Sequence, residues 1–267
     1  MKGLLELRGV SAGYESRRGY GSRRGYESRR GQRKKPVLRN IDLSVNEGEL
    51  LVLAGSNGSG KTTLLKTAAG LLAPLEGEVL VNGKDPGRLK PRERAALTAF
   101  LFQMRDSPWP FTVRETVTQG RFARRGWFSP ESKADHEAVN AALEKADLGA
   151  LAERPITELS GGELQRVYIA RSIVQGAAFL LLDEPENNLD PKYAYMILSL
   201  IESLVREGIG AIVSIHDLRL ASRFATRVAL LGDGSISAIG APAEVLTGEI
   251  LSRVYDLSRD LVHSIVL

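Results

Sequence analysis

The stretch LLVLAGSNGSGKTT, residues 50–63, constrains the possible fold more than any other part of the chain. Its apolar start predicts a buried parallel strand over Leu50–Ala54. The octet that follows, Gly55–Thr62, has the GxxxxGK[ST] pattern of a phosphate-binding loop. A helix is predicted over Thr62–Ala69, so the loop joins a strand to a helix as this motif requires. We therefore expect an α/β chain that binds a nucleoside triphosphate.

The residue types in this loop suit a phosphate for physical reasons. Glycine lets several backbone N–H groups point at one anion, and the amino end of the helix adds a positive dipole. Lys61 can reach the β- and γ-phosphates, and the Thr62 hydroxyl can bind Mg²⁺. The residues that we expect to contact the nucleotide here are Ser56, Asn57, Gly58, Ser59, Gly60, Lys61, Thr62 and Thr63.

Two further predicted strands end in polar residues. Ala178–Leu182 is followed by Asp183 and Glu184, and Gly210–Ile215 is followed by His216. Ligands of open α/β sheets bind at the carboxyl ends of the strands. One carboxylate can hold Mg²⁺ while the next polarises an attacking water. A lone histidine is usually structural, but this one is predicted at the same sheet edge, which favours a functional role.

A second glycine-containing helix start lies in LSGGELQR, residues 159–166. Ser160–Gly162 precedes a helix predicted over Glu163–Gln175 and would form a second anion cradle. A helix N-cap alone would explain the serine, but it would not require two glycines followed by Gln165 and Arg166.

The hexapeptides GYESRR, GYGSRR and GYESRR follow one another over Gly13–Arg30. With no apolar residue but tyrosine, this repeat cannot bury a core. We interpret it as a solvated insertion in a hairpin over residues 13–35, and a basic arm that binds anionic lipid or RNA is the alternative. Tyr14 keeps a fixed distance from the first predicted strand, so its ring could stack on a nucleotide base, unless it is a surface tyrosine.

Charge and composition limit the classes of partner. The net charge is +4, but residues 13–35 hold nine basic and two acidic side chains, so the rest of the chain has a net charge of −3. The isoelectric point therefore gives no argument for a nucleic-acid partner. The absence of cysteine excludes disulfides and thiolate chemistry, and no apolar run is long enough to span a bilayer.

The character of the sequence changes after Gln103. We expect an inserted helical subdomain that starts at 104–151 and runs to about residue 175, while residues 1–103 and 152–267 form the core. Arg121, Arg124 and the pair Trp127-Phe128 either form a partner surface or pack this subdomain.

With these motifs in this order, the chain resembles the ATP-binding subunit of an ABC transporter. The resemblance covers nearly all of the chain except the hexapeptide insertion, and it implies a mostly parallel sheet of the P-loop NTPase type, an N-terminal antiparallel β subdomain and the helical insert. The matching motifs are Walker A at Gly55–Thr62, the Q-loop at Gln103, the signature at Leu159–Gln165, the Walker B end at Leu180–Glu184, the D-loop at Leu189-Asp190 and the switch histidine at His216.

Two residues depart from the family pattern. Ser56 replaces the commoner proline of the phosphate loop, which leaves the backbone cradle intact. Glu186 stands where the family usually has a small hydroxyl residue, and it adds a negative charge near the site.

The resemblance implies that two copies close head to tail on two ATP molecules. The residues that would reach the ATP of the opposite copy are Ser160, Gly161, Gly162, Gln165 and Asp190. Asp183, Thr62 and Gln103 would serve Mg²⁺. Glu184 would be the general base for water, and His216 and Gln103 would complete the catalytic group, with the histidine on the γ-phosphate.

The resemblance also implies membrane partners. A separate permease would carry the substrate, the chain would sit at the cytoplasmic face of the cell membrane, and closure would pass through the helical subdomain near Gln103–Trp127. The stretches Val113–Phe128 and Pro242–Leu257 look most like importers of iron–siderophore, haem or cobalamin, which would add a substrate-binding protein as an indirect partner.

Two other classes compete with this interpretation. One is an ABC ATPase outside transport, in DNA repair, translation or iron–sulfur assembly. Members that act on nucleic acid usually carry coiled-coil or zinc insertions or two ATPase domains, and this sequence has none, so no nucleic-acid partner is expected; an iron–sulfur-assembly ATPase stays open. The other is a regulator that binds nucleotide without turnover, which Glu184 argues against.

Overall fold

Two β-sheets and a set of helices make up the part of the chain described by the computed structural model, residues 3–15, 34–102, 110–125 and 130–256. The strands are β1 (Leu4–Glu15), β2 (Lys34–Asn46), β3 (Leu50–Gly55), β4 (Glu76–Val81), β5 (Thr98–Leu101), β6 (Phe179–Asp183), β7 (Gly210–Ser214), β8 (Arg227–Gly232) and β9 (Ser235–Gly240). The helices are α1 (Lys61–Ala68), α2 (Pro91–Leu97), α3 (Val113–Thr118), α4 (Phe122–Arg125), α5 (Lys133–Lys145), α6 (Gly161–Gln175), α7 (Pro191–Arg206), α8 (Leu218–Phe224), α9 (Pro242–Val245) and α10 (Gly248–Tyr255).

The larger sheet has six strands in the order β5-β6-β7-β3-β8-β9. All neighbouring pairs in it are parallel except β8 and β9, which are antiparallel. The strands β6, β7 and β3 are therefore adjacent and end at the same edge. The predicted α/β fold with a mostly parallel sheet is confirmed, and this strand order brings the three polar strand ends of the sequence together.

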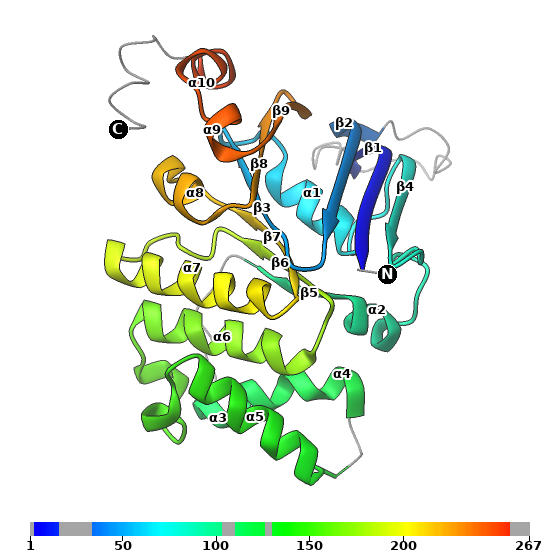
Figure 1. Cartoon of the computed structure of the whole chain (residues 1–267). Coiled ribbons are helices and arrows are strands. Elements are labelled where there is room, and N and C mark those ends of the chain that lie inside the picture. The colour runs from blue at the N-terminus through cyan, green and yellow to red at the C-terminus, as the bar shows by residue number, and fades with distance from the viewer. Residues whose placement is uncertain (1–2, 16–33, 103–109, 126–129, 257–267) are drawn as a thin grey trace, which may run out of the picture.

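The strand β3 is buried on both faces, which explains its continuous apolar sequence. Leu51 and Leu53 pack with α1 and with the three-stranded antiparallel sheet β2-β1-β4. Val52 and Ala54 pack on the opposite face with α6, α7 and α8. Figure 1 shows α1 between the two sheets, and α6 and α7 between the large sheet and the group of α3, α4 and α5. The phosphate-loop strand thus lies at the centre of the molecule.

The hexapeptide repeat begins in the last residues of β1, at Gly13, and the rest of it precedes β2 in the sequence. β1 and β2 are antiparallel, and their register ends with Tyr14 opposite Lys35 and Glu15 opposite Lys34. This pairing supports the prediction of an insertion in a hairpin. Residues 16–33, with Tyr20 and Tyr26, lie outside the described residues.

Two arginines of the helical subdomain form hydrogen bonds within it. The Arg121 Nε donates to Asp135 Oδ1 at 2.7 Å. Arg124 donates to the carbonyl oxygens of Gln175 at 3.0 Å and Gly176 at 2.8 Å, which lie at the carboxyl end of α6. Arg121 is largely buried and fits the packing alternative, whereas Arg124 is exposed and fits either alternative; Trp127-Phe128 lies outside the described part of the chain.

The buried carboxylate of Asp135 joins the start of α5 to this arrangement. Asp135 Oδ2 accepts from the Ser132 hydroxyl at 2.7 Å and from the Ser132 backbone N–H at 3.0 Å. Hydrogen bonds from Ser132, and then from Arg121, hold the pKa of Asp135 well below its usual value.

No helix in the described part of the chain has the length and apolarity needed to cross a bilayer.

We expect Asp135→Asn to lower the free energy of unfolding by about 1–3 kcal/mol at pH 7, because charge-assisted hydrogen bonds are lost. A carboxylate whose folded pKa is depressed stabilises the fold above its unfolded pKa of about 4 and loses that effect as the pH falls further. The gap between wild type and variant should therefore narrow below about pH 4. Urea unfolding over a pH series measures it, with the exposed Glu137→Gln on the same helix as control; a gap independent of pH would contradict this account.

Candidate active site

The loop Ser56–Gly60 between β3 and α1 has the geometry of an anion cradle. Gly58 and Gly60 have φ of +81° and +109°, which L side chains rarely adopt. The Gly60 cap leaves the first N–H groups of α1 without a side-chain hydrogen bond. The hydroxyl of Ser59 is buried and has no hydrogen-bond partner within the described residues. A bound phosphate would satisfy these donors, so the residues present fit the group that the motif predicts.

The phosphate-loop lysine is buried beneath this cradle. Lys61 is 5% exposed, and its Nζ donates to the carbonyl oxygens of Gly55 at 2.8 Å and Ser56 at 3.2 Å. Burial lowers the pKa of Lys61, and the negative charges of Glu184, Asp183 and Glu186 oppose that shift. The carboxylates that follow β6 therefore act on the lysine that follows β3, and the two motifs share one site.

The end of β6 is held by a serine of the neighbouring strand. Ser214 in β7 is fully buried, and its hydroxyl donates to Asp183 Oδ1 at 2.8 Å and accepts from the Glu184 backbone N–H at 2.8 Å. Glu184 has a φ of +51°, an uncommon conformation for a residue other than glycine. One hydroxyl thus orients the proposed Mg²⁺ ligand and the backbone of the proposed general base.

Glu184 and His216 lie in direct contact. His216 Nε2 is 2.5 Å from Glu184 Oε1, and the Asn187 side chain donates to Glu184 Oε2 at 3.0 Å. His216 follows β7, and Glu184 follows β6, so strand pairing brings the two residues together. The Glu184 and His216 side chains therefore meet at one edge of the sheet, where the sequence predicts them.

Two other predicted ATP contacts, Tyr14 and Asp190, and the predicted Mg²⁺ ligand Gln103 have different surroundings. Tyr14, near the end of β1, is 45% exposed, and the Thr63 hydroxyl donates to its oxygen at 3.5 Å, beside the phosphate-loop helix. The Asp190 carboxylate caps α7 by accepting from the N–H groups of Lys192 and Tyr193. The predicted Q-loop residue, Gln103, lies outside the described residues.

The signature segment has structural reasons for some of its residues. The Ser160 hydroxyl donates to Glu163 Oε2 at 2.8 Å in a capping box at the start of α6. A Cβ atom on Gly162 would lie 2.6 Å from the Tyr193 ring, so the packing of α6 on the start of α7 already requires glycine there. Arg166 donates to the backbone oxygens of Ala146 and Asp147 at the end of α5. The anion cradle is therefore not needed to explain Gly162 or Arg166.

Exposure divides the signature residues further. Ser160 and Gly161 are exposed, whereas Gln165 is 7% exposed and buried within its own protomer. A Cβ atom on Gly161 would meet only Leu189 Cδ2, at an ordinary 3.6 Å. Packing therefore does not explain why residue 161 is glycine. The close approach of a nucleotide bound to a second copy is the explanation that the family resemblance offers.

Sequence reasoning missed two residues that shape this site. Ser214 lies in a strand predicted from its apolar residues, and a serine inside GAIVS is a signal of a buried hydrogen bond. Glu186 departs from the family pattern, but the buried position of its side chain is not predictable from the sequence.

The sequence pattern of the ABC transporter family matches residues 38–187, more than half of the chain. The chain belongs to the ABC transporter family. Within this family, it is 40% identical over 227 residues to the achromobactin transport ATP-binding protein CbrD of Dickeya dadantii, which covers 85% of this chain and 84% of that protein. It is 40% identical over 237 residues to the hemin import ATP-binding protein HmuV of Bordetella avium, covering 85% and 89%.

A solved structure of a dimeric bacterial ABC transporter cassette has the same fold. It is 28% identical to this chain, with a TM-score of 0.72, and the match covers 89% of this chain and 98% of that one. As a member of the family, the chain is an ABC ATPase that binds ATP and couples its hydrolysis to transport.

We expect substitutions at the two signature glycines to change stability in opposite directions. Gly162→Ala should lower the free energy of unfolding by about 1–3 kcal/mol, because the new Cβ overlaps the Tyr193 ring. Gly161→Ala has room for its methyl group and should raise stability by up to about 1 kcal/mol through helix propensity. Urea unfolding of both variants measures this.

The same pair has an internal control. In a Tyr193→Gly background the ring and the Cβ of residue 193, 3.0 Å from the Cβ position on Gly162, are both gone, so the cost of Gly162→Ala should disappear there. If Gly162→Ala is as stable as wild type, packing does not set the residue at this position.

Proposed function

We propose that this ABC ATPase works as a head-to-tail dimer that drives the import of an iron–siderophore or haem complex through separate membrane subunits. The observation that carries its chemistry is the contact of His216 Nε2 with Glu184 Oε1, 2.5 Å, at the sheet edge that also holds Lys61 and Asp183. The names of the 40% identical relatives support the transport of an iron complex.

Each residue of this edge has a proposed part in phosphoryl transfer to water. The loop N–H groups and Lys61 hold the β- and γ-phosphates. Glu184 accepts a proton from the attacking water, and His216, which touches the same carboxylate, orients that water and contacts the γ-phosphate. The reaction needs positioning and charge neutralisation rather than a covalent intermediate.

The oxygen donors at this edge suit Mg²⁺. Asp183 supplies a buried carboxylate and Thr62 a hydroxyl, and Mg²⁺ typically combines one or two carboxylates with substrate phosphates. When bound, the ion would neutralise charge on the phosphates. The family resemblance supports Gln103 as a further proposed Mg²⁺ ligand. The described residues hold no cluster of three or more His, Cys, Asp or Glu side chains suited to a metal by themselves.

The second copy would complete each ATP site. Ser160 and Gly161 are exposed at the amino end of the 15-residue helix α6, where N–H groups can meet an anion from outside the protomer. Asp190 is exposed at the start of α7, and the side chain of its neighbour Leu189 lies 3.6 Å from the Cβ position on Gly161. Gln165 is buried, so we propose that it supports this surface from within. The dimeric family cassette with 28% identity supports the arrangement.

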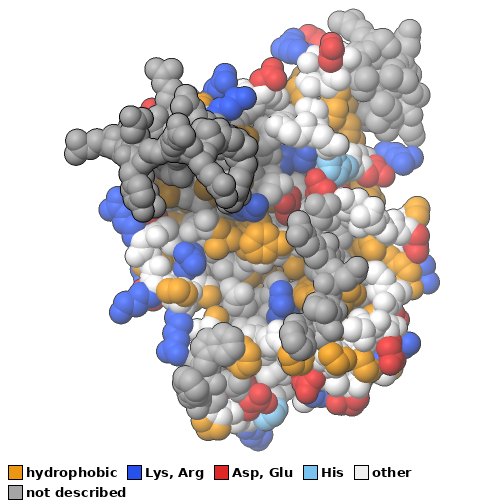
Figure 2. All heavy atoms as spheres, turned by 180° about the vertical axis from the view of Figure 1, so that it is seen from behind, with side chains coloured by type: hydrophobic (Ala, Val, Ile, Leu, Met, Phe, Trp, Pro, Cys, Tyr) orange, Lys and Arg blue, Asp and Glu red, His pale blue; other side chains and the backbone are white. Residues whose placement is uncertain are grey.

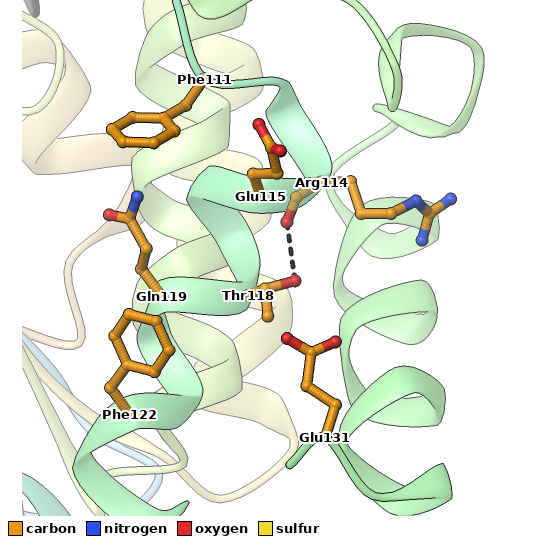
Figure 3. A pocket seen from close by; sticks show the side chains of 7 residues that line it. All are labelled: Phe111, Arg114, Glu115, Thr118, Gln119, Phe122 and Glu131. Atoms are coloured by element: carbon orange, nitrogen blue, oxygen red, sulfur yellow. Dashed lines mark hydrogen bonds between the residues drawn. The ribbon is translucent and has the colours of Figure 1, made fainter. Parts of the chain in front are cut away.

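A groove on the helical subdomain is the proposed docking site of the membrane subunits, and it would place the chain at the cytoplasmic face of the membrane. Its volume is about 590 Å³, and it is lined by Phe111, Arg114, Glu115, Thr118, Gln119, Phe122 and Glu131. Figure 3 shows the rings of Phe111 and Phe122 on either side of Gln119, with two carboxylates across from them. This chemistry suits a permease segment with an apolar side chain and a basic one.

Several large apolar side chains in the described part of the chain are exposed at the surface. Figure 2 shows orange side chains gathered near the centre of the face opposite that of Figure 1, among basic ones. The large hydrophobic residues exposed in the described part of the chain are Tyr14, Leu71, Phe102, Phe111, Tyr195 and Ile239. Phe111 belongs to the groove, and its exposure is one reason to place a partner there.

We expect Glu184→Gln to lower ATP turnover by about 10²-fold or more, because the amide cannot accept the proton of water. The variant should still bind ATP and accumulate as an ATP-bound dimer. Phosphate release and size-exclusion chromatography with ATP measure the two effects, with the exposed Glu249→Gln as control. Hydrolysis near the wild-type rate would show that Glu184 is not the base.

The transport assignment is tested by purifying the tagged chain from gently solubilised native membranes and identifying what accompanies it. We expect a polytopic permease, and a companion binding protein where import is the direction. The double variant Phe111→Ala/Phe122→Ala should retain less permease, whereas Ile239→Ala, an exposed apolar residue on β9, should retain it fully. Recovery of iron–sulfur scaffold proteins or nucleic acid without a membrane partner would overturn the transport function.

A further inference from the structure

The side chain of Glu186 is buried at the sheet edge without a complete set of partners. Glu186 lies two residues after Glu184, beyond the end of β6, and is 8% exposed. Its Oε1 accepts from the backbone N–H of His216 at 3.0 Å. Its Oε2 is buried and has no hydrogen-bond partner within the described residues. A buried carboxylate with one such bond is costly to keep, so its position calls for an explanation.

The His216 backbone N–H, which donates to Glu186, is the first N–H after β7 that does not bond to a neighbouring strand. β7 ends at Ser214, and the Ile215 N–H still donates to the Leu53 carbonyl of β3 at 3.1 Å. The next donor along the chain is His216, and Glu186 receives it. The backbone of His216 is therefore held by a side chain from the β6–α7 connection rather than by the sheet.

Two carboxylates from one connection thus hold one histidine. Glu184 Oε1 meets the imidazole at 2.5 Å, while Glu186 Oε1 holds the backbone. The His216 side chain is 40% exposed, so packing restrains its ring only in part. The direction of the ring must then depend strongly on where its backbone is held.

We propose that Glu186 is a positioning residue for ATP hydrolysis, which holds the His216 backbone so that the imidazole meets Glu184 and the γ-phosphate in a productive direction. This inference rests on the ATPase chemistry proposed above, because it assigns His216 a part in that reaction. It gives the acidic residue at 186 a role that its charge alone does not suggest.

The surroundings of Glu186 indicate which substitution is tolerated. Burial raises the pKa of Glu186, while the hydrogen bond from the His216 backbone opposes that shift. Glutamine has the same length and shape as glutamate, so it should fit the same space and still offer a carbonyl oxygen to the His216 N–H. Alanine would remove the acceptor and leave that N–H without its partner.

The test compares Glu186→Ala and Glu186→Gln in the wild-type and His216→Ala backgrounds by steady-state hydrolysis. We expect Glu186→Ala to lower kcat about 10- to 100-fold, as for a misplaced catalytic group, with KM for ATP changed by less than about 2-fold. Glu186→Gln should keep kcat within about 3-fold of wild type because it keeps the acceptor. In the His216→Ala background, Glu186→Ala should add no further loss.

A second readout does not depend on turnover. Proton–nitrogen NMR of the imidazoles should show the His216 resonances displaced in Glu186→Ala and close to wild type in Glu186→Gln, with His136 on α5 unchanged in both as the internal reference. This measurement decides the question where His216→Ala is already at background hydrolysis.

Two results would overturn the inference: an equal loss of kcat in both backgrounds, or unchanged His216 resonances in Glu186→Ala. Equal damage by alanine and glutamine would do the same, since it would show that the charge and not the acceptor matters. A wild-type chain that does not hydrolyse ATP would overturn the proposed function, and the NMR comparison would still judge whether Glu186 positions His216.

Discussion

The parallel pairing of β6, β7 and β3 is the constraint on which the rest of the molecule depends. These strands lie next to one another and end at the same edge, so strand pairing alone brings the phosphate loop, the carboxylates and the histidine to one place. Burial of β3 on both faces stabilises this arrangement, because Leu51 and Val52 face different layers and neither layer can be lost alone. The site is therefore a consequence of the core.

Side-chain hydrogen bonds then refine what strand pairing makes approximate. The Ser214 hydroxyl joins Asp183 to the backbone of Glu184, and Glu186 joins the β6–α7 connection to His216. All three hydrogen bonds involve buried polar side chains; such bonds are strong in a low-dielectric interior, and the groups are costly to leave without a partner. Lys61 belongs to the same set, because it is buried while three carboxylates act on it. Distances within this edge are thus set by a small number of bonds that a single substitution can remove.

Local patterns predicted the fold well, and tertiary contacts account for what they missed. The phosphate loop was predictable because its spacing, strand and helix all lie within one segment. The positions of Asp183 and His216 near the ends of strands were predictable because a continuous apolar run precedes each of them. The reason for glycine at position 162 was not predictable, because the Tyr193 ring that occupies the space of a side chain there comes from another helix. The choice between surface and packing for Arg121 depended on the end of α6, which no local pattern reveals. Glu186 could be noticed as unusual, but its bond to His216 exists only because β6 and β7 are neighbours.

The register of the β1–β2 hairpin has a consequence for how this sequence can change over time. Pairing reaches Glu15 opposite Lys34; the first six-residue unit begins within β1 at Gly13, and the other two units, residues 19–30, fall between these two positions in the sequence. Gain or loss of a whole unit alters the length of the connection but not the alignment of the strands, so Tyr14 stays beside Thr63. A change in the number of units would therefore give proteins of different length with the same β1–β2 register and the same position of Tyr14 beside the phosphate-loop helix.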